Sequence, residues 1–198
     1  VIMPAGELTE VVLQAGIGTL GACTGSAEQE GHLYLVCGRY VLKIANGTDA
    51  GPIAAAERDL GAGVLGDGAV VFDGAIIIGV QGTAKIHRLA SGGAWAVSAD
   101  VSLRKLETVF WYPQATSSGD AGGAGYRLVG NDGANTMRYV AQSVDPLVLA
   151  NYSASIKIGG ARFTINSLAA ANQHVWFVTS GGVCDVNALG YSPNLTPY

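Results

Sequence analysis

The stretch His32-Leu33-Tyr34-Leu35-Val36-Cys37-Gly38 runs directly into Arg39-Tyr40-Val41-Leu42-Lys43-Ile44-Ala45-Asn46-Gly47. Its β-branched and aromatic residues, divided at Gly38, are typical of two strands joined by a tight turn. Related phrases recur at residues 76–92, 126–140 and 174–187. In the best register Lys43 corresponds to Arg88, Arg138 and Asp185, which gives steps of 45, 50 and 47 residues. The chain therefore repeats one supersecondary unit four times.

The length of this unit predicts the fold. Steps of 45 to 50 residues are those of a four-stranded propeller blade. We therefore expect an all-β protein, a β-propeller or part of one, in which residues 1–198 form a single domain. Its four blade-like repeats cover approximately residues 18–61, 62–106, 107–158 and 159–198. The strands expected from the repeated phrases lie near residues 32–37, 40–45, 75–80, 84–90, 126–130, 136–141, 174–179 and 183–187.

The segments between these phrases complete the expected blades. Residues 18–24 and 61–66 are rich in glycine and alanine and are expected as strands near the crowded central axis. Residues 52–60 contain three consecutive alanines, which suit a short helix. Because the segment occupies the place of a blade's outer strand, the strand is the preferred prediction.

Composition limits the classes of partner and compartment. The net charge is −4 and only 13% of the residues are charged, so no basic field for nucleic acid is expected. No apolar run reaches the roughly 20 residues of a membrane helix, and we expect no membrane insertion. Cys23, Cys37 and Cys184 are far apart and are interpreted as small buried hydrophobic residues, with a disulfide or a reactive thiol as the alternative. The localisation is open.

Candidate chemical groups are few. His32 and His174 occupy equivalent repeat positions, which favours a structural role over a ligand pair, and His87 is expected to face solvent. The pair Arg104-Lys105 is interpreted as the solvated end of a strand. Aspartates beside glycines are interpreted as turn residues: Asp67, Asp73, Asp120 and Asp132. Residues 131–135 offer too few oxygens for calcium. We therefore expect no catalytic, cofactor-binding or metal-binding residues and no cofactor.

Three consecutive aromatic residues give the preferred contact surface. Phe110, Trp111 and Tyr112 precede Pro113 and a glycine-rich stretch. Side chains alternate between the two faces of a strand, so the three rings cannot all point to one side. At least one is expected to point outward or into a contact between blades. The alternative is that both faces of the strand are buried between neighbouring blades.

The repeat resembles the β-propeller superfamily in period and strand order over residues 18–187. It lacks a Trp-Asp dipeptide closing each repeat, the Ser-x-Asp-x-Gly-x-x-Trp box of sialidases and the aromatic spacing of kelch repeats. The glycine- and alanine-rich texture, with irregular stretches such as residues 115–125, also resembles propeller modules of bacteriophage tail and tail-tip proteins. That resemblance implies a virion part without catalysis.

Two function classes follow. The first is a noncatalytic structural or interaction module that contacts protein subunits of a larger assembly, a surface receptor or a glycan. The second is a propeller-based carbohydrate-active enzyme with carboxylates gathered at the axis. A ring of blades that stays open would leave unpaired strand edges in water, so it must be closed or continued by further blades. Either residues 8–14 close it as a four-bladed propeller, or the chain is a segment of a larger one.

Overall fold

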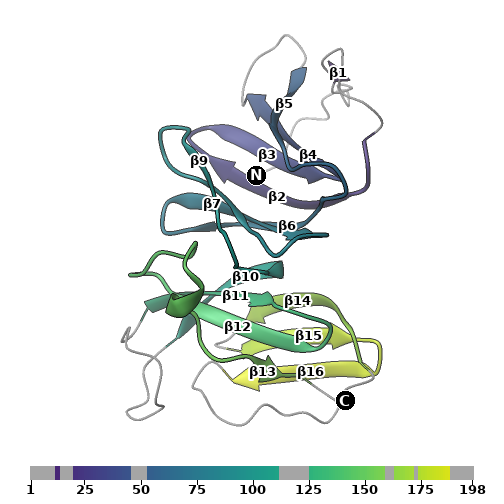
Figure 1. Cartoon of the computed structure of the whole chain (residues 1–198), viewed down its shortest axis with the longest axis vertical. Coiled ribbons are helices and arrows are strands. Elements are labelled where there is room, and N and C mark those ends of the chain that lie inside the picture. Colours follow the sequence, from purple (N-terminus) through teal and green to yellow (C-terminus); the bar gives the residue numbers. More distant parts are fainter. Residues whose placement is uncertain are drawn as a thin grey trace, which may run out of the picture.

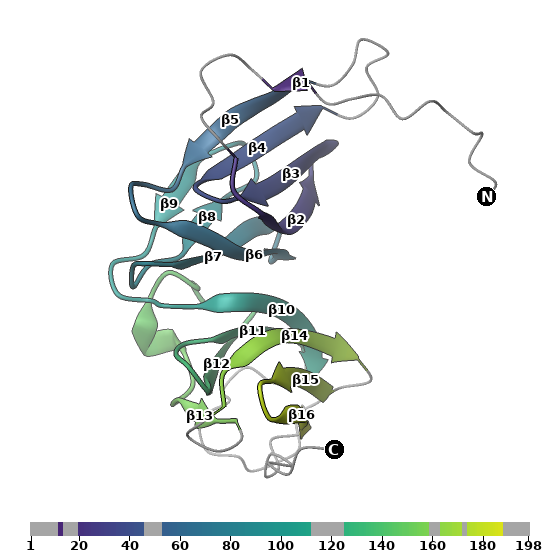
Figure 2. The same ribbon diagram turned by 90° about the vertical axis from the view of Figure 1, so that its right-hand side faces the viewer.

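The computed structural model describes residues 12–13, 20–45, 53–111, 125–158, 163–171 and 174–187. They form four antiparallel sheets arranged as the blades of a β-propeller. Along the long axis of the molecule, blades 1 and 2 occupy one half and blades 3 and 4 the other (Figures 1 and 2). The predicted all-β propeller fold is confirmed.

Each blade is built from strands that are consecutive in sequence. Blade 1 contains β2 (Cys23–Gln29), β3 (His32–Cys37), β4 (Tyr40–Ala45) and β5 (Ile53–Asp59). Blade 2 contains β6 (Leu65–Phe72), β7 (Ala75–Gln81), β8 (His87–Leu89) and β9 (Trp95–Val97). Blade 3 contains β10 (Arg104–Trp111), β11 (Gly125–Asn131), β12 (Thr136–Ala141) and β13 (Ile156–Lys157), with the 3-10 turn Leu149–Asn151 before β13. In blade 4 the described strands are β14 (Ile165–Ala171), β15 (His174–Thr179) and β16 (Gly182–Asn187).

The repeat register predicted from the sequence is confirmed by the strand pairing. Lys43, Arg88, Arg138 and Asp185 all lie in the third strand of a blade and pair with the second strand. The predicted strand at residues 52–60 is also confirmed, because β5 occupies Ile53–Asp59. The first strands begin later than expected, at Cys23 and Leu65 rather than at the glycine-rich openings.

The core consists of contacts between neighbouring blades. In β7, Ile76 and Ile78 pack toward blade 1, whereas Ile77 packs in the cluster that includes Leu103 of the connection to blade 3. All three isoleucines are fully buried because both faces of the sheet are covered. A third cluster joins blades 3 and 4 and includes Val109 and Phe177. Alternating side chains thus hold successive sheets face to face.

Two burial predictions are corrected. His87 was expected to face solvent but is only 4% exposed, because the second face of its short strand is covered as well. Tyr34 is buried, as its place in the register requires, whereas its equivalent Trp176 is only partly buried. In β15 the alternation places Val175 and Phe177, rather than Trp176, in the core with blade 3.

Cysteine chemistry and ring closure also differ from expectation. Cys23 and Cys37 are paired across β2 and β3 and form a disulfide, while Cys184 is buried in the core between blades 3 and 4. Of residues 8–14 the structure describes Val12–Leu13 (β1), which pair in parallel with β5 at the outer edge of blade 1 rather than with a strand of blade 4.

Candidate functional site

A β-bulge interrupts the first strand of every blade near its beginning. The pairing shifts between Cys23 and Gly25 in β2, Gly66 and Ala69 in β6, Arg104 and Glu107 in β10, and Ile165 and Ser167 in β14. A bulge leaves residues out of the ladder and redirects their side chains, and bulges are frequent beside functional sites. The four bulges therefore give one position per blade at which the scaffold can present a side chain toward the axis.

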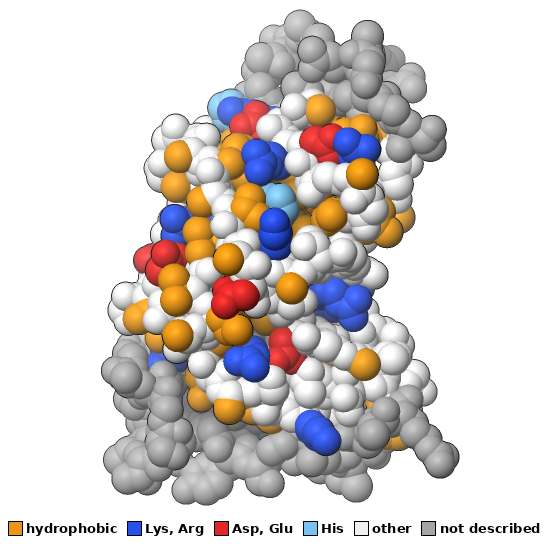
Figure 3. Space-filling model, in the orientation of Figure 1, with side chains coloured by type: hydrophobic (Ala, Val, Ile, Leu, Met, Phe, Trp, Pro, Cys, Tyr) orange, Lys and Arg blue, Asp and Glu red, His pale blue; other side chains and the backbone are white. Residues whose placement is uncertain are grey.

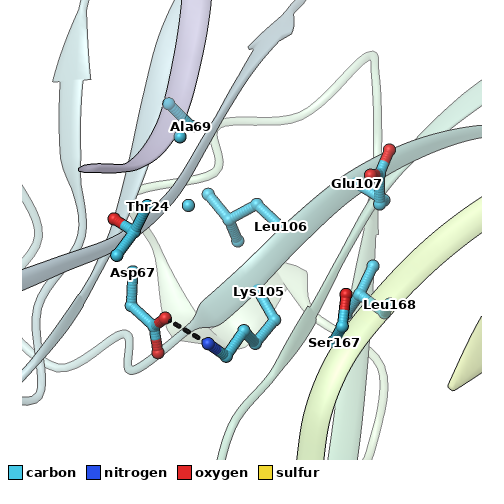
Figure 4. Close-up of a pocket in the computed structure, with 10 residues that line it drawn as sticks. Thr24, Asp67, Ala69, Lys105, Leu106, Glu107, Ser167 and Leu168 are labelled. Atoms are coloured by element: carbon cyan, nitrogen blue, oxygen red, sulfur yellow. Dashed lines mark ion pairs between the residues drawn. The ribbon is translucent and has the colours of Figure 1, made fainter. Parts of the chain in front are cut away.

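These bulges surround a cavity of about 230 Å³ that is lined by all four first strands. Its polar side chains are Thr24, Asp67, Lys105, Glu107 and Ser167, and Leu106 lies among them (Figure 4). The cavity is the candidate functional site, and we call it the axial pocket. Each blade contributes to it, so it exists only when the four repeats are packed together.

An ion pair crosses the axial pocket between blades 2 and 3. Asp67 is 1% exposed, and Lys105 Nζ lies 2.6 Å from its Oδ1. Arg104 Nε lies 3.7 Å from the other carboxylate oxygen, Oδ2. Neither oxygen of Asp67 accepts a hydrogen bond of good geometry. The carboxylate is thus neutralised by charge while its lone pairs stay available.

The backbone around this pair is shaped for close approach. Lys105 has a φ of +51° within a strand, whereas the other described non-glycine residues with positive φ, Glu30 and Asp73, lie at hairpin turns. A Cβ at Gly25 would lie 2.6 Å from Ala69 N, and one at Gly68 would lie 3.0 Å from Leu106 N. Glycine at these positions lets the bulges of successive blades touch through their backbones.

Glu107 supplies the second carboxyl group of the axial pocket. Burial raises the pKa of the Glu107 carboxyl, and a backbone hydrogen bond at Thr108 opposes this effect. Figure 4 places Glu107 on the far side of Lys105 and Leu106 from Asp67. The two carboxyl groups therefore belong to one pocket but do not face each other as an acid and base pair.

The predicted contact surface lies at the other end of β10. Phe110 is 36% exposed and packs edge-on against Tyr126, which is 49% exposed, with ring centroids 5.1 Å apart. Trp111 pairs through its backbone with Gly125. The Trp111 side chain and Tyr112 lie outside the described residues, so the surface remains a prediction for them.

The other candidate residues have structural partners. His32 and His174 stack on Tyr34 and Trp176, at centroid distances of 6.5 and 5.6 Å, and they lie in the first and last blades. The structure therefore does not bring the two histidines together. In the 131–135 loop, Arg138 donates a hydrogen bond to Asp132. Among the described residues no group of three or more His, Cys, Asp or Glu side chains is placed to hold a metal.

None of the polar residues of the axial pocket was predicted as a site residue, and two of them were assigned other roles. Asp67 lies between glycines and was expected in a turn, yet it is buried in the bulge of β6. Lys105 was expected at a solvated strand end, yet it lines the axial pocket and pairs with Asp67. The available signal was the Gly66-Asp67-Gly68 sequence next to a β-branched run, since a glycine inside a strand pattern is typical of a bulge.

Known protein families do not identify the chain: no protein-family model and no curated protein sequence matches it. Solved structures are similar in fold. A streptogramin B lyase matches with a TM-score of 0.59 at 12% identity over 89% of this chain and 55% of its own. The extracellular domain of a protein described as a hybrid two-component system from B. thetaiotaomicron matches with a TM-score of 0.63 at 13% identity, over 95% of this chain and 25% of its own.

A third similar structure is a catalytically inactive variant of virginiamycin B lyase from Staphylococcus aureus with quinupristin, with a TM-score of 0.57 at 14% identity, over 88% of this chain and 55% of its own. The chain thus spans about half the length of the lyases and a quarter of the sensor domain. At these identities the similarity shows the propeller fold alone. It gives no support to the phage-tail origin suggested by composition.

On the face shown in Figure 3, acidic and basic side chains are interspersed rather than gathered by sign. No helix in the described part of the chain is long and apolar enough to cross a membrane.

Proposed function

We propose that this chain is a noncatalytic interaction module of the β-propeller class that contacts protein subunits of a larger assembly. The observation that carries the proposal is the exposed edge-to-face pair of Phe110 and Tyr126. Aromatic rings half in water cost free energy in an isolated protein and are enriched in the centres of protein interfaces. Phe110 belongs to the contact surface expected from the sequence, and Tyr126 adds a residue that was not predicted there.

Neighbouring blades extend the apolar character of this surface. Val71 occupies the position in β6 that Phe110 occupies in β10, one pair before the end of the strand, and is 44% exposed. Gln142 of blade 3 donates a hydrogen bond to Asp73 of blade 2 at the same end. A partner that binds there would meet side chains of two blades held in fixed relation.

The end of the row of blades supports the same class of function. In β15 the residues opposite the core include Val178, which is 46% exposed, and the partly buried Trp176. In stacked repeats such a face is normally covered by the next unit. A partner subunit that binds to this face would bury it.

The enzyme alternative rests on one specific observation, that Asp67 and Glu107 both line the axial pocket. Against it, Asp67 is ion-paired with Lys105 and lies apart from Glu107, whereas glycoside hydrolysis needs two carboxyl groups acting across one bond. One similar lyase is inactive when a histidine is replaced by alanine, and no histidine lines the axial pocket. These points favour the noncatalytic module.

The test is site-specific photo-crosslinking in the producing cell. A photoreactive amino acid is placed at Tyr126 and, as a matched control, at Val97, which is 36% exposed on the outer strand of blade 2. We expect one defined protein adduct from position 126, absent from position 97 and lost with Phe110→Ser. Equal adducts at both positions would refute the contact surface. Turnover of a glycan that is abolished by Glu107→Gln would refute the noncatalytic class.

A further inference from the structure

The residues at the four bulges differ in chemistry although the bulges occupy corresponding places in the first strands of the blades. Blade 1 presents the hydroxyl of Thr24, blade 2 the carboxylate of Asp67, blade 3 the ammonium of Lys105, and blade 4 the hydroxyl of Ser167 beside its bulge. A purely structural need, repeated four times, would be met by similar residues in each blade. A carboxylate, an ammonium and two hydroxyl groups around one cavity are instead typical of a binding site.

Asp67 is the strongest sign that the cavity takes a ligand. Burial of a carboxylate without hydrogen-bond donors is costly, and native proteins satisfy nearly all such groups. Both oxygens of Asp67 lack a donor of good geometry although Lys105 and Arg104 supply opposite charge. Donors from a bound molecule would complete the site.

The charges of the axial pocket select the class of that molecule. Asp67 and Lys105 neutralise each other, so neither is left to attract an ion of opposite sign, and the carboxyl of Glu107 disfavours an anion. The available groups are hydrogen-bond acceptors on Asp67 and Glu107 and donors on Lys105 and Ser167. A neutral molecule with several hydroxyl groups can use both kinds at once.

The size of the cavity limits the ligand further. About 230 Å³ is below the roughly 300–1,000 Å³ of pockets for drug-sized molecules. We propose that the axial pocket binds one saccharide unit, with its hydroxyl groups donating to Asp67 and Glu107 and its oxygens accepting from Lys105 and Ser167. This binding is separate from the protein contact at Phe110, which lies at the other end of β10.

The experiment begins with the intact chain on a printed array of neutral, amino and acidic saccharides. The best-bound free saccharide is then titrated by calorimetry against the wild type and the variants Ser167→Ala and Glu107→Gln. Because both side chains are partly or largely exposed, these variants are expected to fold, which their melting curves check. Ser143→Ala, an exposed hydroxyl in the turn after β12, is the matched control.

We expect binding to neutral saccharides that weakens at least about tenfold in each pocket variant and is unchanged in Ser143→Ala. Asp67→Asn should weaken it as well, because one acceptor oxygen becomes a donor. The absence of array binding, a preference for anionic saccharides, or equal affinity in wild type and pocket variants would each overturn the proposal. Phe110→Ser should leave saccharide binding intact, so a failure here is distinguishable from a failure of the proposed protein contact.

Discussion

Protonation of His87 should destabilise this protein in mildly acidic solution. The side chain lies in β8, is 4% exposed, and its Nδ1 is buried without a hydrogen bond. Burial, assisted by the positive charges of Arg58 and Lys85, lowers the pKa of His87 from 6.5 to about 4. The folded protein therefore holds a neutral imidazole where the unfolded chain binds a proton.

The magnitude follows from proton linkage. Because the pKa is lower in the folded state, the contribution of neutral His87 to stability is complete above pH 6.5 and is lost as the pH falls toward 4. Each pH unit in this interval costs about 1.4 kcal/mol, so the free energy of unfolding falls by about 2 kcal/mol at pH 5 and about 3 kcal/mol at pH 4.

Urea titrations from pH 7.5 to 5.0 of wild type and His87→Gln measure this effect. The range stays above the ordinary pKa values of the acids whose pKa values are lowered, such as Glu30 and Asp59. Between pH 7.5 and pH 5.0 the free energy of unfolding of the wild type should fall by about 2 kcal/mol more than that of His87→Gln. If the free energies of unfolding of wild type and His87→Gln differ by the same amount at every pH, the reasoning is refuted.

Three further predictions concern the same fold. Replacing Cys23 and Cys37 by serine should lower the free energy of unfolding in urea by about 3 kcal/mol, because the disulfide spans a sequence separation of 14 residues. Phe177→Ala should cost about 3 to 5 kcal/mol in the same assay because the ring is fully buried, and Trp176→Ala should cost less because it is partly exposed. Glu107→Gln should raise the melting temperature at pH 7 and leave it unchanged well below pH 4.5, since burial raises the pKa of this carboxyl and the folded state loses stability as the pH rises.

The middle strands of each blade could be predicted because their sequences satisfy local rules. The segment from His32 to Ala45 combines β-branched residues with a turn glycine, and β3 and β4 occupy it with the expected register. The same reasoning misplaced His87. Alternation along a strand separates its two faces, but it cannot say that both are covered, which depends on the packing of blades 1 and 3 against blade 2.

The disulfide and the axial pocket could not be predicted from single segments, because both depend on how different strands pair and pack. Cys23 and Cys37 are separated by 14 residues, and only the pairing of β2 with β3, including its bulge, brings them opposite each other. Asp67 and Lys105 belong to different blades and meet through the packing of two bulges. A glycine next to an aspartate is typical of a turn as well as of a bulge, so composition alone could not choose between them.

The first strand of each blade contains two kinds of position, which serve the repeat and the site respectively. Core positions such as Val109 are constrained by the neighbouring blade and must stay apolar, whereas the bulge positions are released from the ladder and are free to differ. Thr24, Asp67 and Lys105 use that freedom in three successive blades. Because each blade contributes a different group, the arrangement is asymmetric although the scaffold repeats. Specific recognition at the axis therefore depends on the order of the blades, and exchanging the bulge residues of blades 2 and 3 should keep the fold while rearranging the donors and acceptors that a ligand meets.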